Sequence, residues 1–158
     1  MSSEKPEIPN SLNEHWMPFS SNRDFKANPR LITEAKGVYL KNHQGQTQID
    51  ASSGLFCNPL GHGREEIINA VTNQLRKLDY AQPFQQGFGG SFELATKISK
   101  HTPGNLNRIF YTICGSTAVE TAIKISIAYH KARGQGHRFR FVGRERAYHG
   151  MNIGATSV

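Results

Sequence analysis

The order of apolar and polar residues predicts short strands near the start of the chain and a helix after them. Residues 37–41 and 46–50 have the character of strands and are separated by the polar turn 42–45, which together predict a small meander within residues 36–54. In residues 64–78, apolar positions recur at spacings of four, four and three, with acidic residues first and basic residues last. That pattern predicts one amphipathic helix whose charges complement its dipole.

Farther along, the pattern predicts a strand, a helix and a second strand. Residues 108–112 are expected to form a buried strand and residues 138–142 the next one, with a helix over residues 117–133 between them. Thr117 and Glu120 have the spacing of a capping box. The helix is apolar on most sides, so we expect it to be buried against a sheet. The three elements have the size of a βαβ unit.

The segments that join these elements are also distinctive. A loop rich in glycine and aromatic residues is expected over residues 80–90, and a helix from about Ser91 to the turn 102–107. Gly134 lies where a helix C-cap belongs. Residues 1–30 are polar and rich in proline, yet they contain an aromatic cluster at residues 15–19. We expect this arm to pack on its own domain or a partner subunit, or to line a pocket.

Two loops carry the candidate chemistry. Because the carboxyl ends of parallel strands meet at one edge of a sheet, residues 115–117 and 148–150 are expected to lie together. The first loop offers the free N–H groups of a helix N-terminus to an anion. The second offers a tyrosine ring and a histidine. This combination suits a ligand that is both phosphorylated and aromatic, and spacing alone does not choose between a nucleotide and pyridoxal 5′-phosphate. The chain contains neither G-x-G-x-x-G nor G-x-x-x-x-G-K-[ST].

Composition narrows the function classes. The formal net charge is +7, but the basic residues are dispersed except for one patch at residues 138–146, so nucleic acid is a weak candidate partner. No run is long and apolar enough for a membrane span or a signal peptide. Cys57 and Cys114 are far apart, which favours free thiols in the cytoplasm, with Cys114 half-buried in a turn. No metal site is predicted.

Several motifs in one register resemble the N-terminal part of the class III aminotransferases, and most of all the omega-amino acid–pyruvate aminotransferases. The resemblance runs from about Asn13 to the last residue. The motifs that carry it are His15-Trp-Met-Pro-Phe19, Asn28-Pro-Arg-Leu-Ile32, Ser53-Gly-Leu-Phe56, Phe92-Glu-Leu-Ala95, Thr102-Pro-Gly-Asn105, Phe110-Tyr-Thr112, Gly115-Ser116, Thr121-Ala-Ile-Lys124 and Tyr148-His-Gly-Met-Asn-Ile153.

The resemblance implies an α/β architecture of fold type I among the pyridoxal-phosphate enzymes, the aspartate aminotransferase-like fold, here as an N-terminal segment and the first part of the large-domain sheet. Residues 1–35 would be an N-terminal arm, residues 36–80 the start of the small domain, and residues 81–158 the incomplete start of the large cofactor-binding domain. The resemblance also implies a cytoplasmic homodimer with active sites at the subunit interface, where residues such as Phe84 and Gln85 would reach the neighbouring site.

The resemblance assigns roles to individual residues. The cofactor, pyridoxal 5′-phosphate, would be bound by its phosphate at Gly115, Ser116 and Thr117, while Tyr148 would stack on its ring with His149 beside it. The substrate pocket would be lined by Leu55 and Phe56 and closed by Trp16. The substrates would be pyruvate and an amino donor, either an omega-amino acid such as β-alanine or an amine.

The chain departs from the family pattern in two places. Ile113, Cys114 and Thr117 replace the usual Asn-Ser pair and acidic residue around Gly-Ser, which puts any role of that acidic side chain in doubt. Phe56 stands where close relatives often have Trp, which leaves a slightly roomier pocket.

No catalytic residue is expected within this chain, because the family's Schiff-base lysine, the aspartate that pairs with the pyridine nitrogen and the arginine that receives carboxylates lie beyond Val158. Lys97, Lys100, Lys124 and Lys131 are expected on helices or at their ends. We therefore expect no transamination by the 158-residue chain alone, and aggregation or partial folding without the remainder.

Other functions stay open at this point. Within the same scaffold, an aminomutase or a decarboxylase of the dialkylglycine type is possible. A truncated non-catalytic paralogue could bind a phosphorylated ligand or pair with a full-length subunit. A module that binds anions or nucleic acid is the third alternative.

Overall fold

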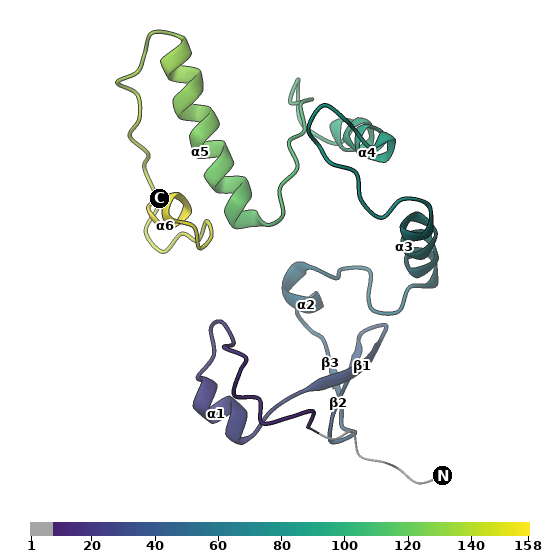
Figure 1. The fold of residues 1–158 in the computed structure, drawn as a ribbon. Coiled ribbons are helices and arrows are strands. Elements are labelled where there is room, and N and C mark those ends of the chain that lie inside the picture. The colour runs from purple at the N-terminus through teal and green to yellow at the C-terminus, as the bar shows by residue number, and fades with distance from the viewer. Residues whose placement is uncertain (1–7) are drawn as a thin grey trace. The chain divides into compact units, whose positions relative to one another are not determined.

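The computed structural model describes residues 8–158 and divides them into two compact units, the first ending at Ala81 and the second beginning at Gln82 (Figure 1). The first unit contains a small sheet with three helices, and the second is helical. The assignment of an arm, a small domain and a large domain to residues 1–35, 36–80 and 81–158 stays a prediction.

The first unit is built around an antiparallel sheet in the order β1-β2-β3, formed by β1 (Ile32–Lys36), β2 (Tyr39–Asn42) and β3 (Thr47–Ile49). The Asn42 side chain shapes the turn between β2 and β3, because its Oδ1 accepts the N–H groups of Gln44 at 3.1 Å and Gln46 at 2.9 Å. The meander predicted from the sequence is confirmed. The sequence pattern did not reveal β1, whose residues are polar or small after Ile32 and all exposed.

Three helices accompany this sheet. α3 (Glu65–Lys77) confirms the helix expected over residues 64–78, with acidic residues in its first turn and basic residues in its last. α1 (Asn22–Ala27) lies in the segment expected to be an irregular arm. α2 (Ser53–Phe56) is a single irregular turn with positive φ values.

The second unit contains α4 (Gly89–Ser99), α5 (Gly115–Ala132) and α6 (Ile153–Thr156). The helices expected from about residue 91 and over residues 117–133 are confirmed, each beginning two residues early. α6 packs on α5, and Figure 1 shows the two side by side. In this unit the Ala155 side chain is buried, with 1% of it exposed. Gly134 follows α5 with φ +72°, the left-handed conformation expected of a residue that ends a helix.

Some predictions for this unit are wrong. Residues 108–112 and 138–142 are not strands, because no strand in the described part of the second unit pairs with them and a β-ladder needs a neighbour. For the same reason α5 has no sheet to cover it, and Ile125 is 54% exposed rather than buried. The capping box is absent, since α5 begins at Gly115 with Cys114 as its N-cap and Glu120 bonds to α6 instead.

Among residues 8–158, no helix is both long and apolar enough to cross a membrane. Lys97 lies in α4, Lys100 at its C-cap, and Lys124 and Lys131 lie in α5. The helical placement predicted for these four lysines is confirmed.

Candidate functional site

The N-terminus of α5 meets the chain that follows Tyr148. The backbone N–H of Met151 donates to Ser116 Oγ at 3.0 Å. A Cβ added to Gly150 would lie 2.6 Å from both Cα and Oγ of Ser116, so only glycine allows this approach. Gly150 is buried and has φ +123°, a conformation that side-chain-bearing residues rarely adopt. The two loops that the sequence placed at one edge are therefore in contact, although no parallel sheet aligns them.

This contact leaves hydrogen-bond donors available at the start of α5. The N–H groups of Gly115, Ser116 and Thr117 are the first three of the helix and have no intrahelical acceptor. Because Ser116 Oγ already accepts from Met151, its O–H is left to donate outward. Ser116 and Thr117 are half-buried and Gly115 is exposed. We call these donors the α5 anion site. They fit a phosphate group, and the space that glycine leaves at position 150 keeps the second loop beside them.

The Cys114 thiol lies at the same end of α5. Its Sγ lies 3.2 Å from Thr117 Oγ1. The Thr117 hydroxyl, followed by the N–H groups at the start of the helix, lowers the pKa of the thiol below its ordinary value, because hydrogen bonds favour the thiolate. Cys114 is exposed, so its expected half-buried position is wrong; Cys57 and Cys114 are free thiols, as predicted.

Glu120 reinforces the contact one turn farther along α5. Its Oε2 accepts the N–H of Gly154 at 3.0 Å, at the start of α6. A carboxylate is favoured there because the first N–H groups of a helix lack partners. The Ser116 and Glu120 contacts thus bind residues 151 and 154 to the same face of α5. The sequence analysis assigned Glu120 to a capping box and Met151 to a motif, but it foresaw neither contact, since only a fold reveals contacts across about 35 positions.

Tyr148 and His149 precede the Gly150 contact directly. Both are exposed, and Tyr148 is 75% so. The structure therefore brings the backbone of the second loop to the α5 anion site and leaves both side chains free to meet a ligand.

In the first unit, Trp16 is 87% exposed. The chain beside it is fixed, because Met17 donates its N–H to Asn22 Oδ1 and accepts from Asn22 Nδ2, both at 2.9 Å. The arm thus contacts α1 through Met17, while the Trp16 side chain is exposed. This agrees with the expected packing of the arm on its own domain, and a role in lining a pocket stays a prediction.

Leu55 and Phe56 are presented outward by an unusual backbone. Four consecutive residues, 53–56, have φ between +52° and +66°. For non-glycine residues the left-handed conformation costs roughly 1–2 kcal/mol each, so other contacts must hold this turn. Leu55 is 73% exposed and Phe56 84%. The two predicted wall residues therefore lie next to one another with their side chains free.

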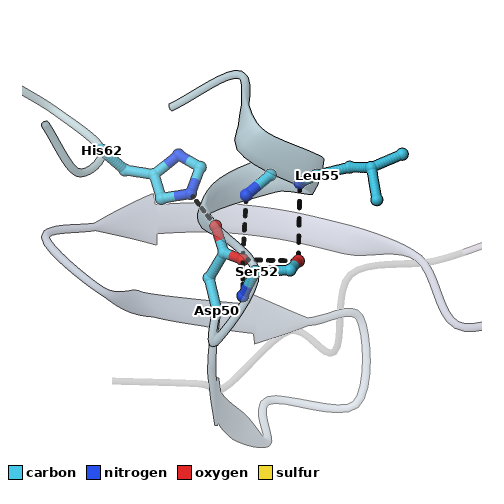
Figure 2. A network of polar contacts seen from close by, with 5 residues as sticks. Asp50, Ser52, Leu55 and His62 are labelled. Atoms are coloured by element: carbon cyan, nitrogen blue, oxygen red, sulfur yellow. Dashed lines mark hydrogen bonds and ion pairs between the residues drawn. The ribbon is translucent and has the colours of Figure 1, made fainter. Parts of the chain in front are cut away.

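Asp50 supplies these contacts, as Figure 2 shows. Its Oδ1 accepts the N–H of Gly54 at 3.0 Å and that of Ser52 at 3.3 Å, while Oδ2 lies 3.1 Å from Nε2 of His62. Ser52 Oγ accepts the N–H of Leu55 at 3.4 Å. The sequence analysis missed Asp50 and His62, although an aspartate two residues before a serine is a frequent turn signal.

The pKa of Asp50 should therefore govern this turn at acid pH. The Gly54 N–H, then His62, hold the pKa of the carboxyl below its ordinary value of 3.8. Because the folded pKa is the lower one, the stabilisation is complete above pH 3.8 and is lost as the pH falls through the folded pKa. We expect the ¹³C shift of the Asp50 carboxyl to titrate below pH 3.8, with the Gly54 amide shift following it. A midpoint at or above 3.8 would contradict the network.

The Gly150→Ala variant tests the α5 anion site. The added Cβ forces Gly150 away from Ser116, breaks the bond from Met151 and leaves the Ser116 hydroxyl unoriented. We expect the affinity for inorganic phosphate, measured by NMR titration of the amides of residues 115–117, to fall about tenfold, the effect of one hydrogen bond. The control is Gly136→Ala, whose Cβ meets open space. Equal affinities in both variants would show that the contact does not matter for the anion.

Comparison with known proteins gives these sites a context. The sequence model of the aminotransferase class-III family matches residues 20–158. The omega-amino acid–pyruvate aminotransferase of Pseudomonas putida is 46% identical over 147 residues, covering 93% of this chain and 33% of the relative. The β-alanine–pyruvate aminotransferase of Pseudomonas aeruginosa is 45% identical over 148 residues, covering 94% and 33%. The chain thus spans about a third of the length of the curated relatives it matches.

Solved structures agree. A thermostable (S)-enantioselective omega-transaminase from Thermomicrobium roseum has a TM-score of 0.89 and 29% identity, covering 93% of this chain and 33% of that one. The omega-transaminase of Pseudomonas jessenii in complex with PMP has a TM-score of 0.86 and 27% identity, covering 90% and 32%. The chain therefore belongs to the class-III aminotransferase family, with the partial α/β architecture of fold type I and pyridoxal 5′-phosphate as the family cofactor.

Proposed function

We propose that the chain is the N-terminal part of a pyridoxal-phosphate-dependent aminotransferase that transfers an amino group from an omega-amino acid such as β-alanine, or from an amine, to pyruvate. The observation that carries this proposal is the similarity to the omega-amino acid–pyruvate and β-alanine–pyruvate enzymes at 45–46% identity over nearly the whole chain. The contact between Ser116 and the Gly150 loop supports it, because it gathers phosphate donors beside an aromatic loop.

In this proposal the α5 anion site binds the cofactor phosphate. The N–H groups of Gly115, Ser116 and Thr117 and the Ser116 hydroxyl donate to its oxygens, and the dipole of α5 favours the negative charge. The ring of Tyr148 stacks on the pyridine, and His149 lies beside it. When bound, pyridoxal phosphate supplies the electron-withdrawing ring through which an amino group leaves the donor.

The first unit contributes the substrate wall. Leu55 and Phe56 present apolar side chains to the donor, and Trp16 closes the pocket from the arm. The fixed turn supports this assignment, because hydrogen bonds from Gly54 and Leu55 hold the backbone that carries these two apolar side chains. Phe84 and Gln85 reach the neighbouring active site of a homodimer. The free cysteines support the cytoplasm as the compartment.

The chain alone supplies no Schiff-base lysine in this proposal. Lys97, Lys100, Lys124 and Lys131 lie on α4 and α5 or at their ends, away from the loops that carry the site residues. Binding, orientation and exclusion of water are therefore the contributions of these 158 residues, and the covalent anchor comes from elsewhere in the complete enzyme.

The direct test is the formation of alanine from pyruvate. We expect the complete enzyme that carries this chain to form alanine with β-alanine or an amine as donor, and the 158-residue chain with added pyridoxal phosphate to form none. Alanine is measured by chromatography, with enzyme free of cofactor as the control. If the complete enzyme forms no alanine, the proposed reaction is wrong and a non-catalytic paralogue is favoured. If the 158-residue chain alone forms alanine, the Schiff-base lysine lies within this chain, against the proposal.

Phe56→Trp tests the substrate wall in the complete enzyme. The larger indole should narrow the pocket, so kcat/KM for a bulky aryl amine should fall by about tenfold relative to β-alanine, the effect of a modest change in pocket volume. The matched control is Phe139→Trp, which makes the same change at an exposed position outside the proposed wall. An unchanged ratio in Phe56→Trp would exclude Phe56 from the donor pocket.

A further inference from the structure

The loop of residues 50–62, which carries Leu55 and Phe56, is fastened at both ends to one turn of the sheet. At its start, the N–H of Asp50 donates to the carbonyl of Val38 at 2.8 Å. At its end, His62 and Gly37 exchange backbone hydrogen bonds of 2.8 and 2.9 Å. Gly37 and Val38 connect β1 to β2. The loop therefore has a fixed base on the hairpin.

The side chains of Asp50 and His62, at the two ends of the loop, contact one another. His62 Nε2 lies 3.1 Å from Asp50 Oδ2, and the Asp50 side chain is only 7% exposed and that of His62 25%. An ionised carboxylate only accepts hydrogen bonds, so the contact places a proton on Nε2 of the ring. The side chains of the other two ion pairs among residues 8–158 are 44–74% exposed, so the burial of this pair indicates a structural role.

The other carboxylate oxygen acts inside the loop. Asp50 Oδ1 accepts the N–H of Gly54, the residue directly before Leu55. The N–H of Leu55 itself donates to Ser52 Oγ. The N–H of Phe56 donates to the carbonyl of Ser52 at 2.9 Å. Asp50 thus connects the base of the loop to the left-handed turn that carries Leu55 (Figure 2). Phe56 follows in the same turn.

We propose that Asp50 and His62 are positioning residues that hold Leu55 and Phe56 as a rigid wall and thereby set the selectivity for the amino donor. The selectivity part rests on the proposed function, because it requires these two side chains to line the donor pocket. The pair itself touches no reacting atom. Its loss should therefore change which donors bind well and leave the chemistry on the cofactor intact.

The first measurement follows the loop itself. In the complete enzyme, amide exchange of Gly54 and Leu55 is measured by hydrogen exchange and mass spectrometry in Asp50→Ala and Asp50→Asn. We expect exchange about tenfold faster or more in Asp50→Ala, the effect of losing a hydrogen bond to a charged acceptor. Asp50→Asn should change it less, because its amide oxygen can still accept from Gly54. The matched control is Asp79→Asn, where an exposed carboxylate of the same unit accepts the neighbouring N–H of Tyr80.

The second measurement separates positioning from stability alone. In the complete enzyme, the ratio of kcat/KM for β-alanine and a bulky aryl amine should change about fivefold or more in Asp50→Ala through KM, with partial rescue in Asp50→Asn. The kcat for β-alanine should stay within about twofold. Where Asp50→Ala does not fold, Ser52→Ala serves in its place, because it removes the acceptor of the Leu55 N–H and the hydroxyl donor to Asp50 Oδ1 while the Asp50 carboxylate stays.

The two measurements test the positioning role, the donor selectivity and the proposed function separately. Unchanged exchange in Asp50→Ala, or equal acceleration in Asp79→Asn, overturns the positioning pair. Faster exchange with an unchanged donor ratio overturns its role in selectivity. A wild-type enzyme with no turnover of any amine overturns the proposed function and the selectivity with it, while the exchange result still decides whether Asp50 holds the loop.

Discussion

The N–H of Met151 donates to the Ser116 hydroxyl, and every assignment made for the second unit depends on this contact. It brings two loops 35 positions apart into contact, and it does so only because Gly150 has no side chain to keep them apart. It also leaves the Ser116 O–H able to donate, beside N–H groups that the helix itself cannot satisfy. In the proposed function, the phosphate site therefore arises from backbone geometry together with a single side-chain oxygen.

In the first unit, a side-chain oxygen that accepts backbone N–H groups likewise holds a loop in place. Its left-handed turn places two apolar side chains outward at a conformational cost, and a nearly buried carboxylate accepts the N–H groups that this backbone exposes. In both units a short polar side chain fixes a strained loop beside residues that stay free for ligands. Strain of this kind is common where a protein prepares a binding surface in advance.

Local patterns in the sequence were sufficient to predict several helices, one hairpin and part of the candidate site. The apolar spacing of residues 64–78 gave α3, and the polar turn 42–45 gave the β2–β3 hairpin, because both depend on neighbours in the chain. The strands expected at 108–112 and 138–142 failed because a strand is defined by its partner, and the described chain offers none. Thr117 and Glu120 had the spacing of a capping box, but the Glu120 carboxylate accepts the N–H of Gly154 instead. Local spacing cannot reveal a contact with a residue so far along the chain. Ser116 was identified from its place before a helix, whereas Asp50 and Met151 needed the fold.

The central claim is that residues 115–117 bind the cofactor phosphate beside Tyr148. Titration of the isotope-labelled chain with pyridoxal 5′-phosphate, followed by NMR, tests it most directly, with pyridoxal as the control that lacks the phosphate. The amides of Gly115, Ser116 and Thr117 and the ring of Tyr148 should shift together and saturate at the same concentration, with much weaker effects from pyridoxal. Saturation that leaves the amides of residues 115–117 unmoved, or that is equally strong for pyridoxal, would contradict the claim.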